Sequence, residues 1–213
     1  MSDVSKKLIV NEIFHSLQGE SSMSGFPTVF IRLTGCNLRC VYCDTEYAFE
    51  EGEEMTIDQI VEKVSEYECS LVEITGGEPM MQENTTFLAE ALIEQELTVM
   101  VETNGSYDIS LLPESAIRIV DIKCPDSGAA DSFLASNYEA LTEKDEIKFV
   151  VSSADDFEWA VSQTIEHLLV YKCFLNISPV PGKVEPSECA QWILDSGLSF
   201  RLNLQLHKHL DLP

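Results

Sequence analysis

The chain has 213 residues, of which 45% are hydrophobic and 23% charged, a composition typical of a soluble globular protein. Its formal net charge is -24, because 37 Asp and Glu residues outnumber 13 Lys and Arg residues. A surface this acidic repels phosphate groups, which argues against nucleic acid and anionic membranes as partners.

The apolar runs and the cysteine content of the sequence indicate the cellular compartment of the protein. The N-terminal segment has no long apolar region, and no stretch approaches the roughly 18 apolar residues of a membrane-spanning helix. We therefore expect a cytoplasmic protein. Seven cysteines, three of them in one short loop, do not form a secreted disulfide framework. Cys69, Cys173 and Cys189 are expected to be reduced core residues.

Strands alternate with helices along the chain. The predicted strands are 8–14, 28–34, 70–75, 98–102, 117–123, 146–151, 173–178 and 200–206. The predicted helices are 56–67, 85–94, 132–141, 155–169 and the segment from Pro186 to before Gly197. Thr56 and Gln59 form the pattern of a capping box, and the acidic stretch 50–54 is predicted to be a solvated turn. The segment 106–115 is short and contains Pro113, so no full crossover helix is expected there.

This alternation indicates βαβ units and a parallel sheet with right-handed crossovers. Five predicted helices and 213 residues are too few for a closed eight-fold barrel, which needs about 250 residues. We predict an α/β fold, a partial TIM-like barrel of about six parallel strands with a reduced set of helices. No repeat, linker or low-complexity segment interrupts residues 1–213, so one domain is expected.

The polar and glycine-bearing stretches follow the carboxyl ends of the predicted strands, where such sheets place their sites. The main one is the loop from Thr34 to Thr45, which holds Cys36, Cys40 and Cys43 in a C-x3-C-x2-C spacing. Three thiolates this close need a cation, and three ligands can cap three corners of a cubane cluster and leave the fourth open. A zinc knuckle or a chance group of buried thiols is the alternative from the loop alone.

The loop resembles the cluster-binding loop of radical S-adenosylmethionine (SAM) enzymes, where a [4Fe-4S] cluster binds SAM at its open iron. The segment Thr75-Gly-Gly-Glu-Pro79 resembles a second motif of that superfamily, which meets the SAM amino group. A longer set of motifs resembles the 7-carboxy-7-deazaguanine synthase family from about residue 11 to the C-terminus. These motifs are 14–20, 30–36, 43–45, 74–79, 102–105, 121–125 and 204–208, followed by Leu212-Pro213.

The resemblance implies a role for each matching position. Cys36, Cys40 and Cys43 would hold the [4Fe-4S] cluster, and the hydroxyl of Thr45 would bind Mg²⁺. The SAM contacts would be Tyr42, Cys43, Asp44, Gly77, Lys123, Cys124, Pro125 and Ser178. The substrate contacts would be Leu17, Gln18, Gly19, Arg32, Thr75 and Pro213. From the residues alone, Arg32 is as well explained by a salt bridge at a strand edge, and His207 by a structural role.

Two positions depart from the family pattern. Ser21 stands where the family usually has glycine, and many members have Ser-Pro-Lys in place of Lys123-Cys124-Pro125.

The resemblance also implies a reaction and partners. A reduced cluster would cleave SAM, and the 5'-deoxyadenosyl radical would take a hydrogen atom from 6-carboxy-5,6,7,8-tetrahydropterin. Ring contraction assisted by Mg²⁺ would release ammonia and give 7-carboxy-7-deazaguanine, a step of queuosine and 7-deazapurine biosynthesis, with SAM regenerated. No catalytic side chain is implied beyond the cluster and SAM. A homodimer and a flavodoxin-like electron donor are expected from the family. The alternatives are a radical SAM activase of a glycyl-radical enzyme and a non-catalytic iron–sulfur or zinc module.

Overall fold

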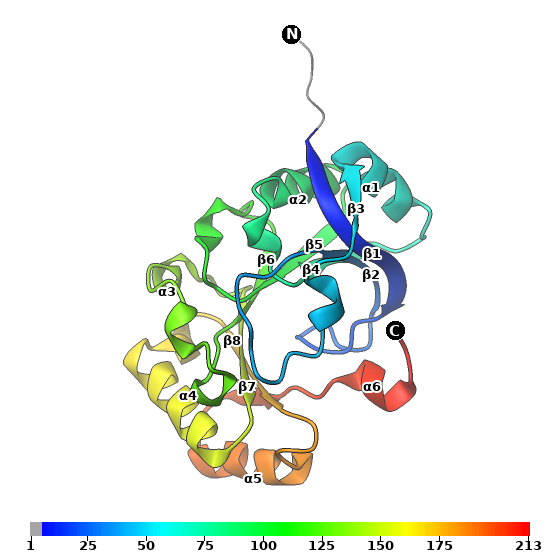
Figure 1. The fold of residues 1–213 in the computed structure, drawn as a ribbon. Helices are drawn as coiled ribbons and strands as arrows, with labels where there is room; N and C mark the ends of the chain where they lie inside the picture. The colour runs from blue at the N-terminus through cyan, green and yellow to red at the C-terminus, as the bar shows by residue number, and fades with distance from the viewer. Residues whose placement is uncertain (1–5) are drawn as a thin grey trace.

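The computed structural model describes residues 6–213, in which nine strands form one curved sheet with most helices on its outer side (Figure 1). The strands are β1 (Lys7–Leu17), β2 (Pro27–Leu33), β3 (Glu53–Thr56), β4 (Leu71–Gly76), β5 (Thr98–Thr103), β6 (Ile117–Asp121), β7 (Glu146–Val151), β8 (Phe174–Pro179) and β9 (Phe200–Leu202). The helices are α1 (Ile57–Ser65), α2 (Thr85–Glu94), α3 (Asn137–Ala140), α4 (Ala154–Glu166), α5 (Pro186–Ser196) and α6 (Leu206–Leu210).

The sheet order is β3-β1-β2-β4-β5-β6-β7-β8-β9, and it does not close on itself. Every neighbouring pair from β2 to β9 is parallel, whereas β1 pairs antiparallel with both β2 and β3. The predicted partial parallel barrel is confirmed. The described residues contain one more parallel strand than the six expected, and β1 and β3 extend the sheet at one edge.

Three local predictions were wrong. The acidic stretch 50–54 was expected to be a turn, but Glu53 begins β3. The charged residues of β3 are tolerated because it is an edge strand, and Lys7 Nζ lies 2.6 Å from Glu54 Oε1. The helix predicted at 132–141 shrinks to four residues. Its buried Asn137 donates hydrogen bonds from Nδ2 to the carbonyls of Gly105 and Tyr107 at 2.9 and 2.8 Å. These bonds attach the segment to the loop after β5.

The last strand is also shorter than predicted. It ends at Leu202, and the chain turns into α6 instead of continuing to residue 206. Asn203 donates from its backbone to Ile177 O at 2.8 Å and from its side chain to Ser178 Oγ at 2.9 Å. These bonds end the strand and direct the C-terminal segment across the open side of the sheet, where α6 lies in Figure 1.

Two apolar cores hold helices to the outer face of the sheet. One packs α1 and α2 against the strands from β1 to β5, and the other packs α3, α4 and α5 against the strands from β6 to β9. The capping box predicted for α1 is present, because Gln59 N donates to Thr56 Oγ1 at 3.2 Å and Thr56 N donates to Gln59 Oε1 at 2.8 Å. In the described part of the chain, no helix combines the length and apolarity needed to cross a membrane.

The inner side of the curved sheet is polar near the carboxyl ends of the strands. Below that layer, Leu71, Met100 and Ile119 fill the barrel interior. The cavity lies in the polar layer above these three apolar residues.

Candidate active site

A cavity of about 260 Å³ lies at the carboxyl ends of the parallel strands. Its wall includes the three cysteines of the loop after β2, the glycines after β4, and side chains from β5 to β8. The C-terminal segment contributes Gln205, His207, Lys208 and Pro213. The expectation that the polar loop motifs converge on one cavity at this edge is therefore confirmed.

The cysteine loop is held near its start and in its middle by backbone hydrogen bonds. Gly35 N donates to Ala48 O at 2.9 Å, and Val41 N donates to Ser127 O at 3.1 Å. Cys36, Cys40 and Cys43 are partly buried, and all three line the cavity. Within residues 6–213, no group of three or more His, Cys, Asp or Glu side chains is close enough to hold a single metal ion.

The Gly-Gly turn after β4 brings its backbone against the cysteine loop. Gly77 N donates to Leu33 O at 3.2 Å, and Glu78 N donates to Gly35 O at 2.7 Å. A Cβ atom on Gly77 would lie only 2.1 Å from Gly35 O, so only glycine allows this approach. The fully buried Glu78 side chain points away from the cavity and accepts three hydrogen bonds, from Met80 N, Thr103 Oγ1 and Asn104 N, at 2.7–2.9 Å.

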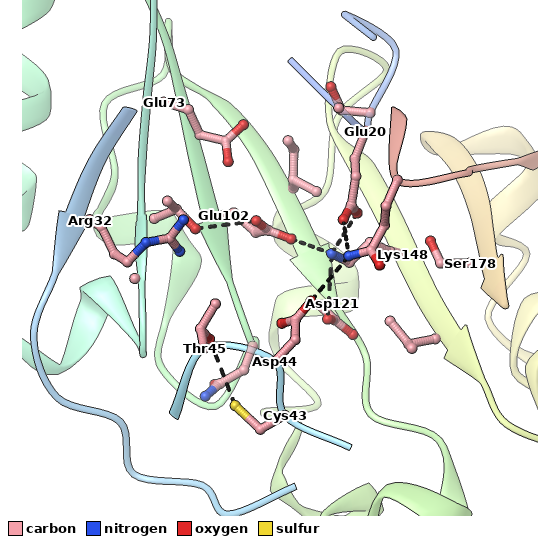
Figure 2. Close-up of a pocket in the computed structure, with 18 of the residues that line it drawn as sticks. Glu20, Arg32, Cys43, Asp44, Thr45, Glu73, Glu102, Asp121, Lys148 and Ser178 are labelled. Atoms are coloured by element: carbon pink, nitrogen blue, oxygen red, sulfur yellow. Dashed lines mark hydrogen bonds and ion pairs between the residues drawn. The ribbon is translucent and has the colours of Figure 1, made fainter. Parts of the chain in front are cut away.

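Figure 2 shows Lys148 at the centre of a cluster of carboxylates on the inner side of the sheet. Its Nζ lies 2.9 Å from Glu20 Oε2 and 3.8 Å from Asp121 Oδ2, and it also bonds Glu102. Lys123 pairs with Asp121 at 2.7 Å. Burial disfavours the charged form of Lys148, but the attraction of Glu102, Glu20 and Asp121 is larger and raises its pKa well above the ordinary value. Lys148 is therefore a buried cation.

Glu73 lies one layer deeper and has a different protonation state. It is 4% exposed and accepts a hydrogen bond from Gln18 Nε2. Burial, reinforced by the negative charge of Glu102, raises the pKa of Glu73 well above its ordinary value. Burial also acts on Glu102, but the charge of Lys148 outweighs it and lowers the pKa of Glu102. The two neighbouring carboxyls thus differ, because their surroundings favour the neutral form of Glu73 and the ionised form of Glu102.

Arg32 combines both roles considered for it. Its Nε donates to Glu12 Oε1 at 2.7 Å, which is the predicted salt bridge, and its side chain also lines the cavity, where Figure 2 shows it opposite Glu102. Beside it, the rings of Phe14 and Phe30 stack with centroids 5.0 Å apart, and both line the cavity. The cavity therefore offers a guanidinium and flat apolar surface side by side.

The loop after β1 is fixed by hydrogen bonds to Glu146 of β7. Ser22 donates from its backbone and hydroxyl to Glu146 at 2.5–3.0 Å. Ser21, the departure from glycine, has a φ of +59°, in the left-handed region that favours glycine. Its carbonyl accepts a hydrogen bond from Arg201, and its Oγ accepts one from Met23 N at 3.2 Å, so local bonds hold serine in this conformation.

The C-terminal segment crosses the cavity and binds both the β1 loop and the cysteine loop. Lys208 Nζ lies 2.6 Å from Asp44 Oδ2, and Gln205 Nε2 donates to Glu20 at 2.9 Å and to Asp44 at 3.2 Å. His207 packs on Gly19, where an added Cβ would lie 1.9 Å from His207 Nδ1. Burial lowers the pKa of His207, which favours the neutral imidazole.

Most predicted site residues line this cavity. Those that do are Leu17, Gln18, Gly19, Arg32, Cys36, Cys40, Tyr42, Cys43, Asp44, Thr45, Thr75, Gly77, Lys123, Ser178 and Pro213. Cys124 and Pro125 do not. The Cys124 side chain is fully buried in the core beneath β6, so its predicted contact with SAM cannot be made through the thiol.

Sequence reasoning did not assign Glu73, Lys148 or a cavity position for His207. A charged residue inside an apolar parallel strand was the available signal for the first two, because such strands are normally buried on both faces.

Comparisons with known proteins agree with this geometry. The Radical SAM superfamily matches residues 30–125. The 7-carboxy-7-deazaguanine synthase of Koribacter versatilis is 42% identical over 96% of this chain and 97% of its own length. That of Chlorobaculum tepidum is 42% identical over 97% and 95%. The crystal structure of QueE from Escherichia coli has the same fold, with a TM-score of 0.76 at 23% identity, covering 94% of this chain and 95% of that one.

Proposed function

The chain belongs to the 7-carboxy-7-deazaguanine synthase family of radical SAM enzymes, and we infer that it converts 6-carboxy-5,6,7,8-tetrahydropterin to 7-carboxy-7-deazaguanine with loss of ammonia. The observation that carries this inference is the near full-length similarity to named synthases. The cavity agrees with it, because three cysteines, a guanidinium and stacked aromatic rings face one space.

The donor set fits a [4Fe-4S] cluster and SAM. Three thiols of one loop face the cavity, and Gly77, which also lines the cavity, has its backbone against that loop. We propose that Cys36, Cys40 and Cys43 hold the cluster, and that Tyr42, Asp44, Gly77, Lys123 and Ser178 surround SAM. When bound, the cluster and SAM supply the one-electron chemistry that removes a hydrogen atom from the substrate. The protein orients the two ligands and excludes water from the space between them.

The substrate would lie on the side of the cavity opposite the cysteine loop. Its carboxylate suits Arg32, whose Nε is already held by Glu12 while its terminal nitrogens form no other hydrogen bond among residues 6–213. Phe14 and Phe30 offer their apolar surface to the flat ring system. Gln18, with its backbone neighbours, and Pro213 close the cavity around it.

The hydroxyl of Thr45 is our candidate ligand for Mg²⁺. It lines the cavity 3.7 Å from Cys43 Sγ, between the cluster loop and the substrate side. Mg²⁺ prefers oxygen ligands and keeps several waters, so one protein hydroxyl together with substrate oxygens and water suits it. The Asp44 carboxylate adds negative charge nearby.

Four wider properties are proposed from family membership. Residues 1–213 would form one radical SAM core domain, of which the first five lie outside the described residues. The protein would be a cytoplasmic homodimer reduced by a flavodoxin-like donor protein. Light scattering coupled to size-exclusion chromatography tests the dimer, and reduction by flavodoxin in place of dithionite tests the donor.

The test of the reaction is an anaerobic assay. The protein is reconstituted with iron and sulfide, reduced, and incubated with SAM, Mg²⁺ and 6-carboxytetrahydropterin, and the products are identified by mass spectrometry. Cys40→Ala should abolish the product, whereas Cys69→Ala, a cysteine outside the cavity wall, should retain it. Cleavage of SAM without a deazapurine would favour an activase, and retention of zinc without any effect on SAM would favour a metal module.

A further inference from the structure

Lys148 connects parts of the cavity wall that are distant in sequence. Asp121, Lys148 and Asn176 are register partners across β6, β7 and β8, so their side chains share the inner face of the sheet. From this position Lys148 bonds Glu102 on β5 and reaches Glu20 on the loop after β1 at 2.9 Å. One ammonium group thus ties together three strands and the loop that carries Gln18.

Attraction between Lys148 and its carboxylate partners stabilises these ion pairs, although burial of each charged group costs free energy. Lys148 and Asp121 are each 7% exposed, and burial of an ion is favourable only when partners with good geometry surround it. Removing Lys148 would leave Glu20, Glu102 and Asp121 facing one another with Lys123 alone for compensation. Carboxylates that surround one ammonium group repel each other once that group is removed, so they would separate or take up protons.

The carboxylates that Lys148 holds belong to the cavity wall. Glu20 and Glu102 both line it, near Gln18 and Thr75, two of the proposed substrate contacts. Thr75 Oγ1 donates to Glu102 Oε2 at 3.2 Å, and Glu20 also accepts from Asn203 at 3.2 Å. A bound pterin carries N–H donors at its ring edge, which pair with carboxylate oxygens.

On the basis of the proposed function, we propose that Lys148 is a positioning residue for the reaction, which orients the carboxylates of Glu20 and Glu102 toward the substrate. It need not touch the substrate itself. Its effect passes through the two carboxylates, so substrate affinity and the coupling of SAM cleavage to product are what it controls.

The proposal predicts a change in pH dependence. The charged groups around the Lys148 ammonium are Glu20 from the β1 loop, Glu102 from β5, Asp121 and Lys123 from β6 and its end, Glu73 from β4, and Asp44 from the cysteine loop. The ionised forms of Glu20 and Glu102 accept more hydrogen bonds from N–H donors than the protonated forms, which keep one oxygen as an O–H donor. The charge of Lys148 lowers the pKa of Glu102 against the effect of burial, so loss of that cation raises the pKa of Glu102 and moves the acidic limb of the kcat/KM profile to higher pH.

The experiment compares Lys148→Met and Lys148→Arg with the wild type and with Lys7→Met, which breaks an exposed ion pair on the outer edge of the sheet. At neutral pH, Lys148→Met should lose about 100-fold in kcat/KM for the pterin, with recovery at higher pH, and should release more 5'-deoxyadenosine per deazapurine. Lys148→Arg and Lys7→Met should retain the wild-type acidic limb. Calorimetric titration of 6-carboxytetrahydropterin into cluster-free protein should show the same loss of affinity for Lys148→Met.

The outcomes separate the two claims. If the wild type makes product and Lys148→Met keeps its pH profile, affinity and coupling, the positioning role is wrong and the proposed function stands. If the wild type neither binds nor converts the pterin, both are wrong. If Lys148→Met does not fold, Lys148→Met/Glu102→Gln is compared with Glu102→Gln alone. Equal pH profiles and affinities in those two variants would overturn the role of Lys148.

Discussion

Gly77 lies where the loop after β4 passes the cysteine loop, and the structure leaves no room there for a side chain. A Cβ atom would lie 2.1 Å from the Gly35 carbonyl oxygen, 2.6 Å from its carbonyl carbon and 2.9 Å from Cys36 Cβ. Gly77→Ala therefore forces the two loops apart by about 1 Å to restore ordinary van der Waals contact. Backbone atoms make the closest contacts, so no rotamer change can absorb the movement.

The displacement acts directly on the residue that would hold one corner of the cluster. A misplacement of about 1 Å near the reacting atoms costs on the order of 100-fold in rate, and overpacking costs about 1–3 kcal/mol of folding free energy. We expect Gly77→Ala to remain folded, to retain less iron after reconstitution, and to form 5'-deoxyadenosine about 100-fold more slowly than the wild type.

The control is Gly197→Ala, at the end of α5. Gly197 has a φ of +66° and no heavy atom within 4 Å of an added Cβ, so alanine there is strained but meets no neighbour. Its loss of stability should be of similar size, about 1–2 kcal/mol, without loss of iron. Iron content and 5'-deoxyadenosine are measured for both variants. If Gly77→Ala keeps the wild-type iron content and forms 5'-deoxyadenosine at the wild-type rate, the steric clash does not disturb the cluster loop. If Gly197→Ala loses as much iron and rate as Gly77→Ala, the losses reflect general destabilisation of the protein and not this clash.

Three further predictions concern stability, ionisation and the C-terminal segment. Arg118→Met should lower the free energy of unfolding in urea by about 3–5 kcal/mol, because the fully buried Asp145 loses its cation; a loss below about 1 kcal/mol would contradict this. Glu73→Gln should gain stability relative to the wild type as the pH rises above the unfolded pKa of a glutamate, because burial raises the pKa of Glu73 and the folded wild type binds a proton there that the unfolded chain has released; a difference in melting temperature that is constant with pH would contradict this. Gly19→Ala should raise KM for the pterin about tenfold by displacing His207, and Gly19→Ala/His207→Ala should restore the position of the segment and part of the affinity; identical KM values for the two variants would exclude this clash as the cause.

The parts of the fold that local patterns determine were predictable. The helix 85–94 and the strand 146–151 have the predicted bounds, and the capping box at Thr56 is present. The helix and the strand are rich in apolar residues, and the capping box marks the start of α1. The edge strand β3 was missed because Glu53 and Glu54 resemble a solvated turn, and its pairing with β1 depends on residues about fifty positions earlier.

The site was predictable where a motif named the residue and not where the sheet brought distant residues together. The three cysteines stand in a loop whose spacing is informative by itself, whereas Gln18 and Arg32 were assigned through the resemblance to a family. The charge of Lys148 inside an apolar strand marks the position, but its contacts with Glu20, Glu102 and Asp121 come from distant segments that no local spacing predicts.

The direction of the Cys124 side chain was not predictable for a similar reason. Cys124 follows β6 at the edge of the sheet where the cavity lies, but its side chain faces the outer core. Successive side chains of an extended segment point to opposite faces, so a shift of one residue decides whether a side chain faces the cavity or the core.

The measurement that tests the central claim most directly is the number of 7-carboxy-7-deazaguanine molecules formed per molecule of SAM consumed. The reconstituted wild-type protein is given limiting SAM with excess 6-carboxytetrahydropterin, and both compounds are followed by mass spectrometry. We predict several molecules of deazapurine per SAM consumed, because the family resemblance implies that SAM is regenerated. Consumption of SAM to 5'-deoxyadenosine and methionine without any deazapurine would contradict the proposed function while leaving the radical SAM assignment intact.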